Sequence, residues 1–147
     1  MNTLRLGSIF GLLFIVACSS DSIPGPPQGL PYSAAFRACG PADGPAVAII
    51  LAAAPITSSS VPTPHVQIGI EQPVEKIVDS WTINQGMAAS YIGTSNQIES
   101  AVTGVVAIKS IGSDSSVLGS AQLTFPNHGV IRGGFTARWI TAPVLCG

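Results

Sequence analysis

The sequence predicts an all-β domain: an antiparallel sandwich or small barrel of about seven strands with at most one short helix. Apolar and polar residues alternate through much of the chain, which is typical of strands with one buried face. The apolar fraction comes from Ala, Val and Ile among many Gly, Ser and Thr, and these residues suit twisted strands and tight turns. Clusters of turn-forming residues separate the candidate strands.

The first two candidate strands differ in their patterns. Residues 46–52 form a continuous apolar run, which predicts a strand buried on both faces. Residues 65–71 alternate instead, so one face of this second strand carries the apolar side chains Val66, Ile68 and Ile70.

The period then changes to that of a helix. Four apolar residues recur at helical spacing after Pro73, a residue that suits the start of a helix: Val74, Ile77, Val78 and Trp81. We expect a short helix over residues 73–78 that leads into a strand over 80–84. A single strand over 74–83 is the alternative.

The second half predicts a meander of four strands, over residues 87–92, 101–110, 117–125 and 130–140. Turn residues at 112–115 and 126–129 close two hairpins. In the last strand we expect one face to point inward, with Ile131, Phe135, Ala137 and Trp139.

The first 18 residues have the pattern of an exported protein. Arg5 precedes a mostly apolar run over residues 6–17, which is shorter than the ~20 residues that a membrane span needs. The run ends in Ile15-Val16-Ala17-Cys18, and polar residues follow. An ordinary signal peptide that ends at Ala17, or an uncleaved span, are the alternatives.

The same four residues resemble the lipobox of bacterial lipoproteins, although Ile15 and Val16 differ from the residues that the family prefers. The resemblance implies a signal peptide over residues 1–17 and a mature chain that begins at Cys18. It further implies that acyl chains on this cysteine anchor the protein to a membrane of the cell envelope. Ser19 stands where the family places an aspartate for retention, which favours the outer membrane if the cell has two.

Residues 18–33 predict a tether, because four prolines and two glycines disfavour both a helix and a sheet ladder. Stretched at ~3 Å per residue, this segment reaches some 40 Å. Residues 34–147 then form the folded domain.

Two cysteines remain after Cys18 is assigned to lipid. Cys39 and Cys146 lie near the two ends of the domain, and neither belongs to a C-x-x-C motif. In an oxidising envelope we expect them to form a disulfide. The bridge closes a loop of roughly 100 residues and stabilises the fold by up to ~4–5 kcal/mol in the chain-entropy model.

Charge excludes one class of partner. Removing residues 1–17 leaves five basic and seven acidic side chains, a formal charge of −2, and the sequence contains no basic run. Nucleic acid is therefore not an expected partner.

Candidate catalytic residues are few. The two histidines, His65 and His128, stand at a strand start and in a hairpin turn, where a histidine is usually solvated or structural. The carboxylates are scattered, and no nucleophile elbow, phosphate loop or metal-ligand spacing occurs. We expect no cofactor and no metal.

Binding is better supported by the large aromatic residues. Trp81, Tyr91 and Trp139 are amphipathic and suit contacts with glycans or proteins. The structural alternative places both tryptophans in the core, because Trp81 ends the helical pattern and Trp139 continues the inward face of its strand.

The closing hairpin is similar to the last hairpin of small, uncharacterised bacterial lipoproteins. The shared residues are Leu123, Phe125, Gly129, Gly133, Phe135 and Ala137, together with Cys39-Gly40-Pro41 before the first apolar strand. These positions imply structural roles, such as the close backbone approach that Gly133 permits.

The sequence therefore predicts a noncatalytic, lipid-anchored envelope domain that binds an envelope protein or glycan, or that has a structural role in an assembly. An envelope hydrolase that uses His65 or His128 with a nearby carboxylate is the alternative.

Overall fold

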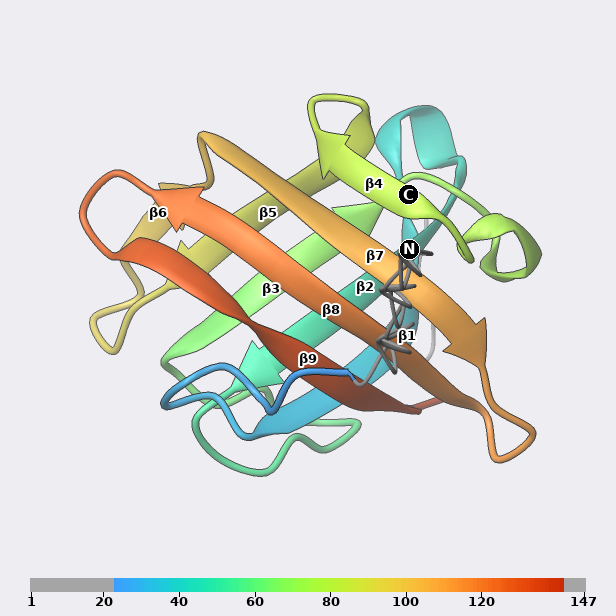
Figure 1. The fold of residues 1–147 in the computed structure, drawn as a ribbon, viewed down its shortest axis with the longest axis horizontal. Coiled ribbons are helices and arrows are strands. Elements are labelled where there is room, and N and C mark those ends of the chain that lie inside the picture. Colours follow the sequence, from blue (N-terminus) through green and yellow to red (C-terminus); the bar gives the residue numbers. More distant parts are fainter. Residues whose placement is uncertain (1–22, 142–147) are drawn as a thin grey trace, which may run out of the picture.

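The computed structural model describes residues 23–141 (Figure 1). Nine strands follow one another in this range: β1 (Tyr32–Cys39), β2 (Pro45–Ala52), β3 (His65–Ile70), β4 (Ser80–Ile83), β5 (Gly86–Ile92), β6 (Ile98–Ser100), β7 (Thr103–Ile111), β8 (Ser116–Phe125) and β9 (Gly129–Trp139). Two 3-10 turns, η1 (Pro41–Asp43) and η2 (Val74–Lys76), are the helical elements of the described range, which contains no α-helix.

Eight of the strands close into a barrel. The sheet order is β3-β2-β1-β9-β8-β7-β4-β5-β6, and a further pairing of β3 with β5 joins the ends. Strand β6 pairs with β5 outside this ring. Most pairs are antiparallel, but β1 with β9 and β4 with β5 are parallel. The predicted all-β class is confirmed, and the architecture is a mixed barrel.

Sequence patterning found seven of these strands and missed two. In β1, Ala34 and Ala35 are both buried although they point to opposite faces, so the strand shows no alternation. Strand β6 has only three residues and lies between the predicted strands over residues 87–92 and 101–110. Because both strands lack a clear period of two, the estimate of about seven strands was low.

The predicted helix over residues 73–78 is only a single 3-10 turn, η2, and Val78 is exposed, so the helical spacing did not indicate a full helix. Strand β4 follows the turn as a separate strand, as predicted. Ile77 is fully buried directly after the turn. The alternative of one strand over residues 74–83 is therefore wrong.

Side chains from all eight strands fill the barrel interior. They share one face of the sheet, as the register shows: Ile49 pairs with Ile68, which in turn pairs with Ala89. The largest fully buried side chains of the described range include Phe125, Ile49, Leu51, Ile68, Ile70 and Leu123. The predicted inward faces of residues 65–71 and of the last strand are confirmed, with Ile131 and Trp139 of the last strand partly buried.

Strand β2 is buried on both faces, as its continuous apolar run predicts. Its inner residues join the barrel core. Its outer face carries Ile50 and Ala52, which pack with Ala34, Ile56 and Ile140 in a second, smaller cluster. The segment after β2 therefore folds back over the outside of the barrel.

The described part of the predicted tether lies against the barrel. The amide of Gly134 in β9 donates a hydrogen bond of 2.8 Å to the carbonyl of Gly25, and Leu30 is buried in the core. A Cβ atom at Gly134 would collide with the Pro24 carbonyl oxygen, so glycine is needed for this close approach. The chain thus contacts β9 well before β1 begins at Tyr32.

Candidate functional site

Both tryptophans contribute to the core. Trp81 packs against the barrel interior, and its indole nitrogen donates a hydrogen bond of 2.9 Å to the carbonyl oxygen of Ile77. Trp139 is half-buried against the same core. Each side chain thus has a structural role that accounts for its position.

His65 also has a structural role. It is 7% exposed, and its Nδ1 atom lies 2.9 Å from the carbonyl oxygen of Pro62. In the described part of the chain, no carboxylate pairs with this ring. The hydrogen bond instead ties the start of β3 to the loop that precedes it.

The third aromatic residue, Tyr91, lies in a cleft with the second histidine. Tyr91 comes from β5, Glu99 from the neighbouring β6, and His128 from the turn between β8 and β9. Strand β6 places Glu99 directly opposite Tyr91, because these two residues are register partners. The fold thus joins two hairpins that are about 30 residues apart in sequence.

The rings in this cleft are stacked. The centroids of Tyr91 and His128 lie 3.8 Å apart, with the ring planes tilted by 31°. On its inner side Tyr91 meets the core residue Phe125 edge-on, at 6.1 Å and 63°. The rigid core therefore holds Tyr91, and Tyr91 in turn supports the more exposed His128.

Glu99 links the two hairpins through both oxygens of its carboxylate. Oε1 accepts a hydrogen bond from the backbone N–H of Asn127, and Oε2 pairs with the Nδ1 atom of His128. Partial burial raises the pKa of Glu99. The hydrogen bonds from Asn127 and His128 and the charge of His128 outweigh this effect, so the pKa lies below its ordinary value.

The remainder of the cleft is polar and open. Its volume is about 620 Å³, and its other lining residues are Gly93, Thr94, Ser95, Gln97, Ile98 and Asn127. No lysine or arginine lines it. Ile98 is 72% exposed at its edge and provides the largest apolar contact available there.

The predicted cysteine sites fall mostly beyond the described residues. Cys39 ends β1, whereas Cys18 and Cys146 lie outside residues 23–141. The lipidation at Cys18 and the Cys39–Cys146 pairing both stay predictions.

Over residues 23–141, no three His, Cys, Asp or Glu side chains gather closely enough to hold a metal ion. No helix in this part of the chain has the length and apolar character of a membrane span.

Sequence reasoning identified Tyr91 and His128 but did not bring them together. Glu99 was one of several scattered carboxylates, and no pattern in the sequence marks Gln97 or Asn127 as part of a site. Nothing local in the sequence indicates that the 93–99 and 126–129 turns meet, because their contact depends on the barrel register.

In comparisons with known proteins, no protein family, no curated protein and no solved structure matches this chain. The function is therefore argued from the geometry of the cleft and from the residues that precede the barrel.

Proposed function

We propose that this chain is a lipid-anchored lipoprotein of the cell envelope whose barrel is a noncatalytic module that binds a neutral glycan. The cleft formed by Tyr91, Glu99 and His128 is the proposed binding site. The observation that carries the proposal is the bridging of two hairpins by Glu99, which holds an aromatic pair and several amide and hydroxyl groups around one open cleft.

The chemistry of the lining favours a glycan over a charged ligand. Gln97, Asn127, Thr94 and Ser95 provide donors and acceptors that suit sugar hydroxyl and acetamido groups. The basic ring of His128 is already paired with Glu99, so no free cation is present to neutralise a phosphate or carboxylate. Convergent polar groups beside an aromatic surface are typical of ligand sites.

The contacts of His128 favour binding over catalysis. Its Nδ1 atom is occupied by Glu99, and one ring face lies against Tyr91. Within residues 23–141, no serine, threonine or cysteine hydrogen-bonds to the ring. An activated nucleophile needs such a contact with its base.

The anchor rests on the lipobox resemblance at Cys18. Mass spectrometry of the protein extracted from membranes should show a mature chain that begins at Cys18 and carries acyl chains, and Cys18→Ala should abolish both cleavage at this residue and acylation. An unmodified cysteine would contradict the anchor. Ser19 supports the outer membrane as the destination in a cell with two membranes.

A disulfide between Cys39 and Cys146 belongs to the same proposal. Its support is that β9 runs parallel to β1 as its neighbour, so the chain leaves β9 in the direction of the end of β1, where Cys39 lies. An oxidising compartment outside the cytoplasm is where such a bond persists.

The glycan site is tested with the purified protein and isolated cell-wall glycan fragments. Binding is measured by calorimetry for the natural protein, for Tyr91→Ala and for the matched control Tyr32→Ala. Tyr91 holds His128 at the cleft through a ring contact of a kind that contributes on the order of 1 kcal/mol. Tyr91→Ala removes this support, so it should weaken binding at least fivefold. Tyr32 is an exposed tyrosine on β1 outside the cleft, so its loss should change nothing. Equal affinities for the two variants, or no binding of glycan at all, would contradict the site.

A hydrolase is the second candidate, because His128 does have a carboxylate partner. In this case His128 is a general base, and Ser95 or Thr94 in the same cleft is the nucleophile. His128→Ala and Ser95→Ala should then abolish release of soluble fragments from cell-wall glycan, whereas His65→Ala should not if the protein stays folded. If the natural protein releases no more soluble fragments than buffer alone, this candidate is excluded.

A further inference from the structure

The outer face of β7, β8 and β9 differs in charge from the remainder of the described surface. These three strands contain Lys109, Arg132 and Arg138 and no aspartate or glutamate. Four acidic residues gather instead around the turns η1 and η2: Asp43, Glu71, Glu75 and Asp79. The mature chain has an expected net charge of −2, but its charges are unevenly distributed and this face is cationic.

Both arginines of this face are exposed and available. They lie six residues apart on β9, which separates them by ~20 Å along the strand. Within residues 23–141, no carboxylate forms an ion pair with either of them. Asp114, in the turn between β7 and β8, accepts hydrogen bonds from the hydroxyl and the backbone amide of Ser116.

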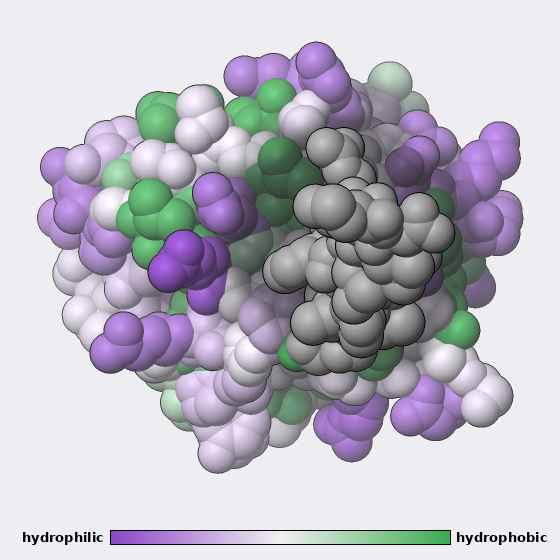
Figure 2. Space-filling view, viewed as in Figure 1, coloured by the Kyte–Doolittle hydropathy of each residue, from purple (hydrophilic) through white to green (hydrophobic). Residues whose placement is uncertain are grey.

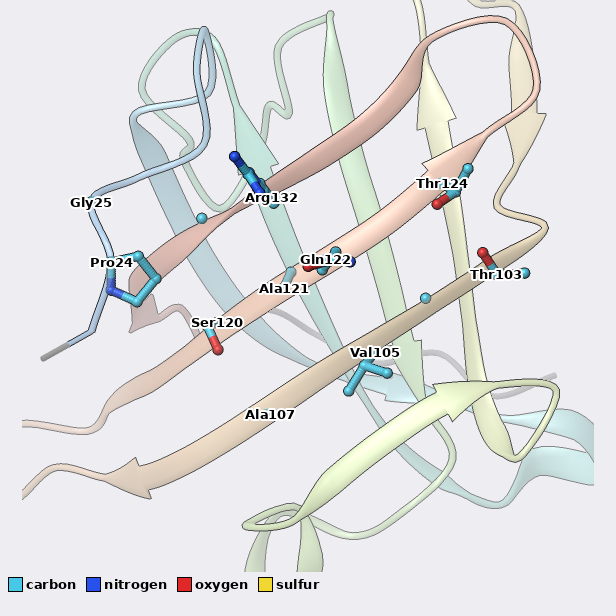
Figure 3. A pocket seen from close by; sticks show the side chains of 12 residues that line it. Pro24, Gly25, Thr103, Val105, Ala107, Ser120, Ala121, Gln122, Thr124 and Arg132 are labelled. Atoms are coloured by element: carbon cyan, nitrogen blue, oxygen red, sulfur yellow. The ribbon is translucent and has the colours of Figure 1, made fainter. Parts of the chain in front are cut away.

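A shallow groove of about 860 Å³ runs over this face (Figure 3). Arg132 stands at its β9 side, and small or uncharged side chains such as Ser120, Gln122 and Thr124 line its floor. Val105, at 44% exposure, is one of the lining residues. Val130, at 57% exposure, lies outside the groove on the same face of β9 as Arg132, two residues along the strand. Figure 2 shows hydrophilic and hydrophobic residues side by side on the part of this face that is coloured.

The chain enters the barrel on the same face. Pro24 and Gly25 line the groove beside Arg132, as Figure 3 shows. Only four residues lie between Cys18 and Ile23, and the five steps of ~3.3–3.6 Å along this chain reach at most about 18 Å. An acyl anchor on Cys18 therefore keeps this face close to the bilayer, whereas a free tether over residues 18–33 would permit any orientation.

We propose that the outer face of β7–β9, with Arg132 and Arg138, docks on a membrane surface through the phosphate groups of anionic lipid headgroups. This inference rests on the lipid anchor of the proposed function. A basic residue near an anionic membrane surface contributes favourable binding energy, and the exposed valines add apolar contact with the interface. The Tyr91–Glu99–His128 cleft shares no lining residue with the groove on this face, so docking through the groove leaves the cleft available to a glycan.

The lipidated protein is incorporated into vesicles of phosphatidylcholine alone, or of phosphatidylcholine with phosphatidylglycerol, and its exposed side chains are footprinted with a carbene reagent. We expect Val105 and Val130 to be protected in the anionic vesicles only. Val61 and Val78, which are exposed outside this face, act as internal references and should label equally in both. Equal labelling of Val105 in the two kinds of vesicle would overturn the proposal.

Two double variants with the same net charge distinguish the effect of this face from the effect of net charge. Arg132→Gln with Arg138→Gln should remove the protection, whereas Arg37→Gln with Lys76→Gln removes the same charge elsewhere and should preserve it. In a Cys18→Ser chain without acyl groups, sedimentation with the anionic vesicles should weaken about fivefold for each arginine removed from the face. If the two double variants behave alike, the face is not the docking surface.

The same experiments distinguish the two proposals. Absence of acyl chains on Cys18 contradicts the anchor, and sedimentation of the Cys18→Ser chain still tests the face without it. Acylation with an unprotected face contradicts the docking surface alone.

Discussion

Individual residues of the cleft illustrate how one side chain joins two distant turns. Glu99 accepts hydrogen bonds from both Asn127 and His128, so its ionised form is part of the folded structure. Tyr91 shows the opposite dependence, because its position is set by packing on Phe125 rather than by polar contacts. The site therefore combines a rigidly packed aromatic ring with hydrogen bonds that depend on the charge of Glu99. We call the contacts of Glu99 with Asn127 and His128 the Glu99 clasp.

The stability of this clasp depends on pH. The pKa of Glu99 in the folded protein lies below its ordinary value of 4.5, so folding favours the ionised carboxylate. The stabilisation is present above pH 4.5 and is lost as the pH falls through the lowered pKa. Thermal unfolding should therefore show a smaller loss of Tm below about pH 4.5 for Glu99→Gln than for the natural protein.

Glu75→Gln provides the matched control for this prediction. Glu75 is an exposed carboxylate in η2, outside the cleft. Its replacement removes the same charge and should leave the acid dependence close to that of the natural protein. Identical acid profiles for Glu99→Gln and Glu75→Gln would show that the clasp does not stabilise the fold.

At the scale of elements, β9 organises much of the molecule. It pairs with β8 along its whole length and with β1 over two residues, and the 23–31 segment lies against the part that β1 leaves uncovered. Gly133 and Gly134 permit this contact because a Cβ atom at either position would collide with the backbone of Pro24–Pro27. The glycines of the last hairpin thus have the structural role that their sequence context predicts.

Gly134→Val should displace the segment that precedes β1. The added side chain collides with the Pro24 carbonyl, so we expect residues 23–31 to become sensitive to limited proteolysis. The barrel strands should stay protected from the protease. Residue 134 is the register partner of Ser120 and lies on the outer face of the sheet, so the added side chain does not enter the barrel interior.

A glycine variant of the segment itself is the control. Gly25→Ala introduces a Cβ atom that meets nothing within 4 Å, so its proteolysis should match that of the natural protein. If Gly134→Val leaves residues 23–31 resistant, these residues are held to the barrel by contacts other than the one at Gly134.

At the scale of the whole molecule, closure depends on pairings between residues far apart in sequence. The β3–β5 pair joins the ends of the sheet, and β1 with β9 brings together the first and last described strands. Such a topology has a high contact order, and a covalent link between its ends restricts the unfolded chain strongly.

Reduction of the proposed Cys39–Cys146 disulfide should therefore destabilise the barrel. We expect the free energy of unfolding to fall by up to ~4–5 kcal/mol, measured by urea denaturation with and without reductant. In a Cys18→Ser background, Cys39→Ser should reproduce this loss and make the protein insensitive to reductant. If reductant leaves the denaturation midpoint of the natural protein unchanged, the two cysteines are not linked.

By itself, the sequence determined the all-β class, seven of the strands and the inward faces of β3 and β9, because alternation is a local consequence of strand geometry. It also indicated the hairpin at residues 126–129 and the aromatic residue Tyr91. Tertiary structure alone decided barrel closure, the strands β1 and β6, and the docking of residues 23–31 on β9. It also decided that Glu99 meets His128, because register and long-range packing bring side chains together without leaving a periodic pattern in the chain.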